Sequence, residues 1–170
     1  MTETSPAGSE WASRSIPPTP RSIVELLSTG TLDPGLAATL WLLVEARVPL
    51  LVVAATTGDG KSTLLRALLD FLPPEVVRVE LKGSDETFDW LPQASELGWP
   101  GKARATVAAP VRPDTTMLVA DELSDDMPSQ ALGGRARIAV RSTTIGYGLA
   151  AAMPGDSLAD VLAALGRPPI

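Results

Sequence analysis

The 170-residue chain contains neither cysteine nor histidine. Without cysteine it forms no disulfide and offers no thiol nucleophile, and without either residue it lacks the usual zinc ligands. These two absences fit a cytoplasmic protein, which is the location that we expect. Basic residues are outnumbered, because 14 Lys and Arg stand against 20 Asp and Glu, for a net charge of −6. That balance argues against a protein that binds nucleic acid by neutralising its phosphates.

Long hydrophobic runs are missing too. The most apolar stretch, residues 37–55, is interrupted by Glu45 and Arg47, so we expect no insertion into a membrane. The N-terminus has no basic start followed by an apolar run, the pattern of a secretory signal. Residues 1–20 are rich in Ser, Thr and Pro, and we expect a flexible tail there. The length and the 45% hydrophobic content predict one domain, over residues 21–170.

The most informative stretch is residues 48–64, an apolar run followed by a glycine-rich turn. The run carries no charge and many β-branched residues, which predicts a strand buried on both faces of a parallel sheet. It leads into Ala55-x-x-x-x-Gly60-Lys61-Ser62. This spacing fits the phosphate-binding P-loop, with Ala in place of the usual first Gly.

The residue types in this turn suit phosphate chemistry. Gly58 and Gly60 lack Cβ, so the backbone can direct successive N–H groups into one concavity that binds oxyanions. Lys61 is expected to reach the β- and γ-phosphates, and the Ser62 hydroxyl to ligate Mg²⁺. The predicted nucleotide-binding residues are Thr56, Thr57, Gly58, Asp59, Gly60, Lys61, Ser62 and Thr63. The alternative is a glycine turn that carries Lys-Ser by coincidence, but the strand–loop–helix context favours phosphate binding.

A second apolar strand, expected to begin at residue 115, ends in Asp121-Glu122. A carboxylate is costly to bury, so two of them at the carboxyl end of a core strand usually face a ligand crevice. We expect Asp121 to hold Mg²⁺ through water and Glu122 to polarise the attacking water, both from a strand that neighbours the P-loop strand. Alone, the pair would be better interpreted as two solvated acids where the strand ends at the surface. Beside a P-loop, we interpret it as functional.

The remaining segments alternate between helical and strand patterns. A helix over residues 34–46, with Asp33 as N-cap, is expected to place Leu36, Leu40, Leu43 and Val44 against the sheet. The other expected helices cover residues 22–27, where Ser22 can act as the N-cap, residues 62–71 and 127–143, and a last segment capped by Asp156 or Ser157. The other expected strands cover 76–81 and 147–153. Residues 82–113 are rich in Gly and Pro, and only 103–109 has a plausible short element. This order predicts an α/β fold of three layers, a mainly parallel central sheet with helices on both faces.

From Ile23 onward the chain resembles the ATPase domain of the type II and type IV secretion and pilus-assembly ATPases, especially those of tight-adherence (Flp) pili. The resemblance rests chiefly on the P-loop and its approach, Gly30-Thr31-Leu32-Asp33-Pro34 and Glu45-Ala46-Arg47. It also includes Arg112-Pro113-Asp114 before the strand that leads to Glu122, and residues 147–158. It implies a RecA-like P-loop NTPase that uses ATP and Mg²⁺, with hydrolase activity and assembly into hexameric rings.

The chain also departs from that family. Residues 147–158 match the strand and helix around the family's His box, yet Pro154 follows Met153 where the His would stand. The family's Asp box has no clear counterpart in residues 80–86, and its arginine-bearing N-terminal domain has none in these 170 residues. Phosphoryl transfer depends on such charge-stabilising groups. The sequence therefore supports nucleotide binding more strongly than fast hydrolysis.

Three functions remain open at this point. The first is a Mg²⁺-dependent ATPase that does mechanical or switching work on a protein partner, which Glu122 favours. The second is a nucleotide-binding regulatory or scaffold protein with little or no hydrolysis, which the missing His favours. The third is a small-molecule kinase with Arg135, Arg137 and Arg141 as a lid, although no acceptor-binding motif is recognisable. A homo-oligomer, hexameric by the resemblance, and a monomer are both compatible with the sequence.

Overall fold

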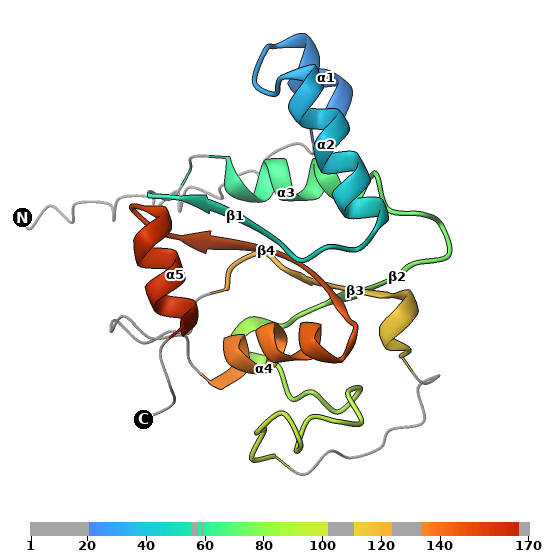
Figure 1. The fold of residues 1–170 in the computed structure, drawn as a ribbon, viewed down its shortest axis with the longest axis vertical. Helices are drawn as coiled ribbons and strands as arrows, with labels where there is room; N and C mark the ends of the chain where they lie inside the picture. Colours follow the sequence, from blue (N-terminus) through green and yellow to red (C-terminus); the bar gives the residue numbers. More distant parts are fainter. Residues whose placement is uncertain (1–20, 56–57, 59, 102–110, 124–133, 167–170) are drawn as a thin grey trace, which may run out of the picture.

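The computed structural model describes residues 21–55, 58, 60–101, 111–123 and 134–166. These residues form a four-stranded sheet between two layers of helices (Figure 1). The tail expected at 1–20, the short element expected at 103–109 and the start of the helix expected at 127 lie outside the described residues. None of the described helices is both long and apolar enough to span a membrane.

Helices and strands follow one another much as the sequence predicts. They are α1 (Ile23–Ser28), α2 (Pro34–Glu45), β1 (Leu50–Ala54), α3 (Lys61–Leu69), β2 (Val77–Glu80), β3 (Thr116–Ala120), α4 (Gly134–Ser142), β4 (Gly148–Pro154) and α5 (Leu158–Gly166). The predicted N-caps are confirmed, because Ser22 Oγ accepts from the Glu25 N–H at 3.2 Å and Asp33 Oδ1 accepts from the Gly35 N–H at 2.8 Å. A capping side chain satisfies an N–H group that the first helical turn leaves without a partner.

The sheet has the order β1-β4-β3-β2, and all of its strand pairs are parallel. Successive strand residues face opposite sides. Leu51, Leu118 and Leu149 therefore join the core under α4 and α5, whereas Met117 and Ala150 join the core under α3. In Figure 1, α1, α2 and α3 lie on one side of the sheet and α4 and α5 on the other. The predicted three-layer α/β fold with a parallel sheet agrees with this arrangement.

β1 is less buried than its sequence suggests. Among the described strands it pairs only with β4, and Val53 is 37% exposed while the rest of the strand is partly buried. The prediction of a strand buried on both faces is therefore wrong. An apolar run indicates a buried strand, but the run cannot show that this strand lies at the edge of the sheet.

α2 packs mainly across α3, and this changes which of its residues are buried (Figure 1). Ala37 and Val44 are buried, whereas Leu36 is 51% exposed, so its predicted burial against the sheet is wrong. Trp41 stacks on Phe71 just beyond the end of α3, with ring centroids 5.7 Å apart. A helix that packs on another helix buries a narrower stripe of its own surface than a helix that packs on a sheet. Part of the apolar face of α2 therefore remains in solvent.

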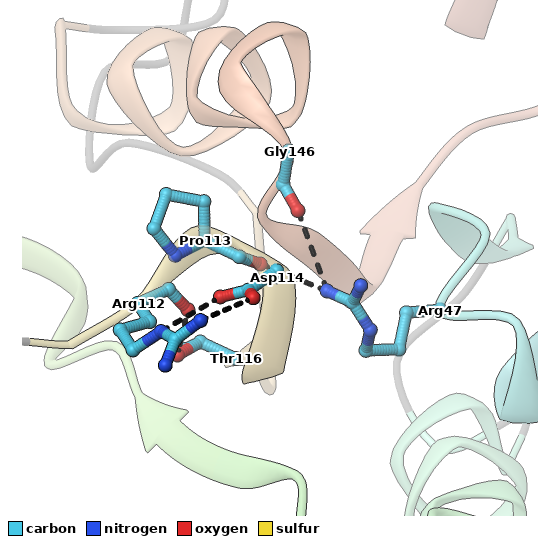
Figure 2. Close-up of polar contacts among 6 residues, drawn as sticks. All are labelled: Arg47, Arg112, Pro113, Asp114, Thr116 and Gly146. Carbon is cyan, nitrogen blue, oxygen red and sulfur yellow. Dashed lines mark hydrogen bonds and ion pairs between the residues drawn. The ribbon is translucent and has the colours of Figure 1, made fainter.

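Arg47 connects several segments at the amino edge of the sheet (Figure 2). Arg47 follows α2 with a φ of 55°, in the left-handed region, and its N–H bonds to the Val44 carbonyl in a Schellman-type helix end. Its guanidinium donates to the carbonyl oxygens of Pro113 at 2.8 Å and Gly146 at 3.4 Å. One side chain thus ties the α2–β1 junction to the starts of β3 and β4.

Arg112 and Asp114 form an exposed ion pair at the same edge, with Nη2 and Oδ2 2.7 Å apart (Figure 2). The Arg112 hydrogen bond lowers the pKa of the Asp114 carboxyl below its ordinary value. Thr116 Oγ1 donates to the Arg112 carbonyl at 2.7 Å, which fixes the start of β3. The Arg-Pro-Asp part of the family resemblance therefore lies at the amino edge of the sheet, where it shapes the entry to β3.

The segment after β2, for which the sequence predicted little structure, is built around one buried carboxylate. Glu86 is 3% exposed and accepts from the backbone N–H groups of Lys82, Thr87 and Phe88 and from the indole of Trp90, at 2.8–3.1 Å. Three of these bonds end on Oε1, and the Lys82 bond ends on Oε2. A buried charge is tolerated where donors surround it in this way.

Two arginines of α4 fasten this segment to the rest of the domain. Arg135 Nε donates to the Glu86 carbonyl at 2.8 Å, and Arg141 Nη1 donates to the Leu97 carbonyl at 2.9 Å. The Arg135 guanidinium also lies 5.3 Å from the ring centroid of Trp99, a cation–π distance. These contacts hold the fold together, so Arg135 and Arg141 do not support the lid that a kinase would need.

Glu86→Gln is expected to lower the free energy of unfolding by about 1–2 kcal/mol, because the Oε2 acceptor for the Lys82 N–H becomes an amide donor. The three bonds to Oε1 can persist in this variant. Urea unfolding followed by tryptophan fluorescence would measure the change. Glu96→Gln, at an exposed position of the same segment, serves as the control and should leave the midpoint unchanged. Equal midpoints for both variants would contradict the role assigned to Glu86.

Candidate functional site

The predicted site residues collect at the carboxyl edge of the sheet. Because all four strands are parallel, the segments that leave their carboxyl ends share this edge. β1 leads into residues 55–60, here called the glycine loop, and β3 leads into Asp121 and Glu122. Open α/β sheets bind ligands at this edge.

The two described glycines of the glycine loop adopt backbone conformations that favour glycine. Gly58 and Gly60 have φ angles of +96° and +83°, where a side chain would strain the backbone, and nothing lies within 4 Å of a Cβ built at either position. Gly60 is the N-cap of α3 and provides no side-chain cap. The first N–H groups of the helix, including those of Ser62 and Thr63, therefore point toward the loop without an acceptor in the helix. Thr56, Thr57 and Asp59 lie outside the described residues.

Lys61 turns back from the start of α3 toward the end of β1. Its Nζ lies 3.5 Å from the Ala54 carbonyl oxygen, a weak hydrogen bond across the mouth of the glycine loop. The ammonium and the helix N-terminus thus bring positive charge to the same place. An anion held by the loop would meet both.

Asp121 lies on the α3 side of the sheet, where Arg66 holds it. Arg66 donates through Nη2 to Asp121 Oδ2 at 2.5 Å and through Nε to Oδ1 at 3.3 Å. Ser62 and Arg66 are four residues apart in α3, so their side chains share one face of the helix. Asp121 therefore faces the side of α3 that carries the predicted metal ligand Ser62. Its contact residue, Arg66, lies one helical turn farther from the glycine loop than Ser62 does.

Glu122 is exposed and borders a pocket of about 230 Å³ between the ends of β2 and β3 and the helix α4. The pocket walls are mainly apolar and include Leu81, Phe88, Leu123 and Ala136. Asp121 also lines this pocket, and in addition it bonds to Arg66 of α3. The two acids therefore share one pocket, and Asp121 is held from α3 as well.

The acidic pair lies farther from the glycine loop than predicted. β4 pairs with both β1 and β3 and lies between them, so the expectation that β3 neighbours the P-loop strand is wrong. Ala120 is level with Leu51 across β4, three residues before Ala54, so the ends of β1 and β3 are about 14 Å apart, two strand spacings across the sheet and about 10 Å along it. This gap leaves room for phosphates, a metal ion and water between Lys61 and the two acids.

Two residues of this region were not predicted from the sequence, Arg66 and Glu80. Glu80 ends β2, and partial burial together with the nearby Asp121 carboxylate raises its pKa above the ordinary value. The hydrogen bond and the charge of Asp121 raise the pKa of the Arg66 guanidinium. The i, i+4 spacing from Ser62 could have indicated Arg66, but its partner on β3 depends on the tertiary fold.

No protein-family model matches the chain. Two similar proteins of the archaeon Methanocaldococcus jannaschii are named only as uncharacterized. Uncharacterized protein MJ0900 is 36% identical over 73 residues, which are 43% of this chain and 13% of the relative. Uncharacterized protein MJ1287 is 30% identical over 82 residues, 46% of this chain and 30% of the relative. The chain thus spans less than a third of the length of either relative, and their names assign no activity.

Proposed function

We propose that this protein binds ATP with Mg²⁺ as a RecA-like P-loop NTPase and hydrolyses it. The observation that carries the proposal is the N-terminus of α3, whose N-cap Gly60 provides no side-chain cap, behind Gly58 and Gly60 with the Lys61 ammonium turned back toward the end of β1. Backbone N–H groups, a helix N-terminus and a lysine together make a site for a polyphosphate. A structural turn would need none of the three.

Each residue of the site has a distinct task in this proposal. The N–H groups that follow Gly60 and the Lys61 ammonium bind the phosphates, and Ser62 and Asp121 hold the Mg²⁺ ion, which offsets charge on the β- and γ-phosphates. Glu122 accepts a hydrogen bond from the attacking water and takes its proton as the water oxygen bonds to the γ-phosphorus. The bond to the β-phosphate oxygen then breaks, and ADP leaves.

The second candidate is a nucleotide-binding regulatory or scaffold protein with slow or absent turnover. A specific observation favours it, because Asp121 is engaged by Arg66 and Glu122 borders the mainly apolar pocket beside α4. A site that needs rearrangement before catalysis can still bind a nucleotide. Under this alternative, the Glu122 carboxylate takes no part in a reaction.

Relatedness to the secretion and pilus-assembly motors forms part of the proposal. It is supported by the parallel sheet, by the position of the glycine loop after β1, and by the acids at the end of β3. We further propose that the protein works in the cytoplasm, on a protein partner or as a ring of like subunits. The exposed edge of β1 and the exposed residues of α2 leave surface available for such contacts.

Binding of a non-hydrolysable ATP analogue tests the proposal directly. Calorimetric titration with AMP-PNP and Mg²⁺ is expected to give a saturable one-site isotherm, whereas adenosine, which lacks the phosphates, should bind much more weakly. The phosphate-binding groups described above are the physical reason for the difference. Equal affinities for the two compounds, or no binding of the analogue, would overturn the proposal.

A further inference from the structure

We propose that Arg66 competes with Mg²⁺ for the Asp121 carboxylate and so sets the metal concentration at which the site fills. The inference rests on the proposed function and adds a metal-tuning residue to it. Arg66 would be a positioning residue, since it acts through Asp121. Its guanidinium occupies both Asp121 oxygens, through the bonds at 2.5 and 3.3 Å.

The geometry places the competing cation beside the expected metal position. Arg66 lies one helical turn beyond Ser62 on the same face of α3, and one turn corresponds to about 5.4 Å along the axis. Asp121 can therefore turn from the guanidinium to an ion at Ser62 without a large movement of β3. While Arg66 holds both oxygens, the carboxylate offers Mg²⁺ little free negative charge.

The surrounding charges strengthen the competition. Glu80 interacts electrostatically with both Asp121 and Arg66 from the end of β2. The two carboxylates repel each other, and the guanidinium between them offsets that repulsion. A divalent ion at Asp121 would offset it equally well. Arg66 and a bound Mg²⁺ ion would therefore offset the same repulsion, and each would do so at the expense of the other.

The ion pair is weak enough to be displaced. The Arg66 and Asp121 side chains are 59% and 48% exposed, and ion pairs in solvent contribute little to stability. Mg²⁺ keeps several water ligands and binds proteins through one or two carboxylates, so an exposed acid suits it. Removing the guanidinium should therefore make metal binding easier while the fold remains intact.

Arg66→Met tests this inference, because it keeps an apolar stem and removes the charge. The measurement is the Mg²⁺ concentration that gives half-saturation of AMP-PNP binding, followed by calorimetry at fixed nucleotide. We expect this concentration to fall by about five-fold in Arg66→Met, because Mg²⁺ no longer has to displace an exposed ion pair whose strength corresponds to a factor of about that size. Arg66→Lys retains the charge without the two-pronged geometry and should fall between wild type and Arg66→Met.

Arg112→Met is the matched control, because it breaks an exposed Arg–Asp pair of the same kind at the opposite edge of the sheet. Its metal requirement should equal that of the wild type. An unchanged or increased requirement in Arg66→Met, with nucleotide binding retained, would overturn the inference alone. Absence of nucleotide binding from every variant and from the wild type would overturn the proposed function and this inference together.

Discussion

Replacing Lys61 by Ala is expected to weaken the binding of AMP-PNP and Mg²⁺ by roughly 10- to 100-fold, the value of one hydrogen bond to a charged group. The Lys61 ammonium lies across the mouth of the glycine loop, 3.5 Å from the Ala54 carbonyl. A phosphate there would gain both a hydrogen bond and a charge pair, and the variant removes both. Calorimetric titration of wild type and variant under the same conditions measures the loss.

Lys82→Ala is the matched control for this variant. Lys82 is an exposed lysine that follows β2 at the same edge of the sheet. Its replacement by Ala removes the same net charge as Lys61→Ala but leaves the glycine loop unchanged. Its affinity should remain within about two-fold of the wild type, since long-range attraction between exposed charges is largely screened by salt. Equal affinities of Lys61→Ala and the wild type for AMP-PNP would contradict the proposal that the glycine loop binds phosphate.

Glu122→Gln is expected to lower the single-turnover rate of ATP hydrolysis by about 100-fold or more, the usual contribution of a general base. The amide keeps the size of the side chain but cannot take a proton from water. The affinity for AMP-PNP should stay near the wild-type value, because the phosphates are held by the glycine loop. Quenched-flow measurement with excess enzyme separates this step from product release.

Glu75→Gln provides the comparison, because Glu75 is an exposed acid before the amino end of β2, at the opposite edge of the sheet. It should hydrolyse ATP at the wild-type rate. If Glu122→Gln and the wild type hydrolyse ATP equally slowly, the enzymatic proposal falls and the regulatory alternative takes its place. Retained binding together with lost hydrolysis would support the ATPase.

Much of the local structure could be predicted from short stretches of sequence. Ser22 and Asp33 cap their helices as expected, because a cap depends on side chains within three residues. The strands that end at Ala54 and Ala120 were found from their apolar runs. The glycines of the loop have the positive φ angles that the motif requires. Binding of ATP by these residues stays a prediction.

The errors concern residues whose surroundings come from distant parts of the chain. Val53 is partly exposed and Leu36 largely so, because strand order and helix packing decide what covers an apolar residue. The buried Glu86 went unnoticed, because three of its four donors are backbone N–H groups, and a sequence does not show where those point. The described part of the segment that it organises has little regular structure, as the Gly and Pro content indicated, so only the buried carboxylate was missed.

The sequence by itself determined the elements of this protein and the residue types at the end of each strand. Those features depend on periodicity, capping and turn chemistry, which act over a few residues. Only the tertiary structure decided that β4 lies between β1 and β3, and that Arg66 holds Asp121. Strand order and long-range ion pairs arise from packing between distant segments, with Met117 and Gly148 31 residues apart and Arg66 and Asp121 55 residues apart, and no local pattern encodes such pairings.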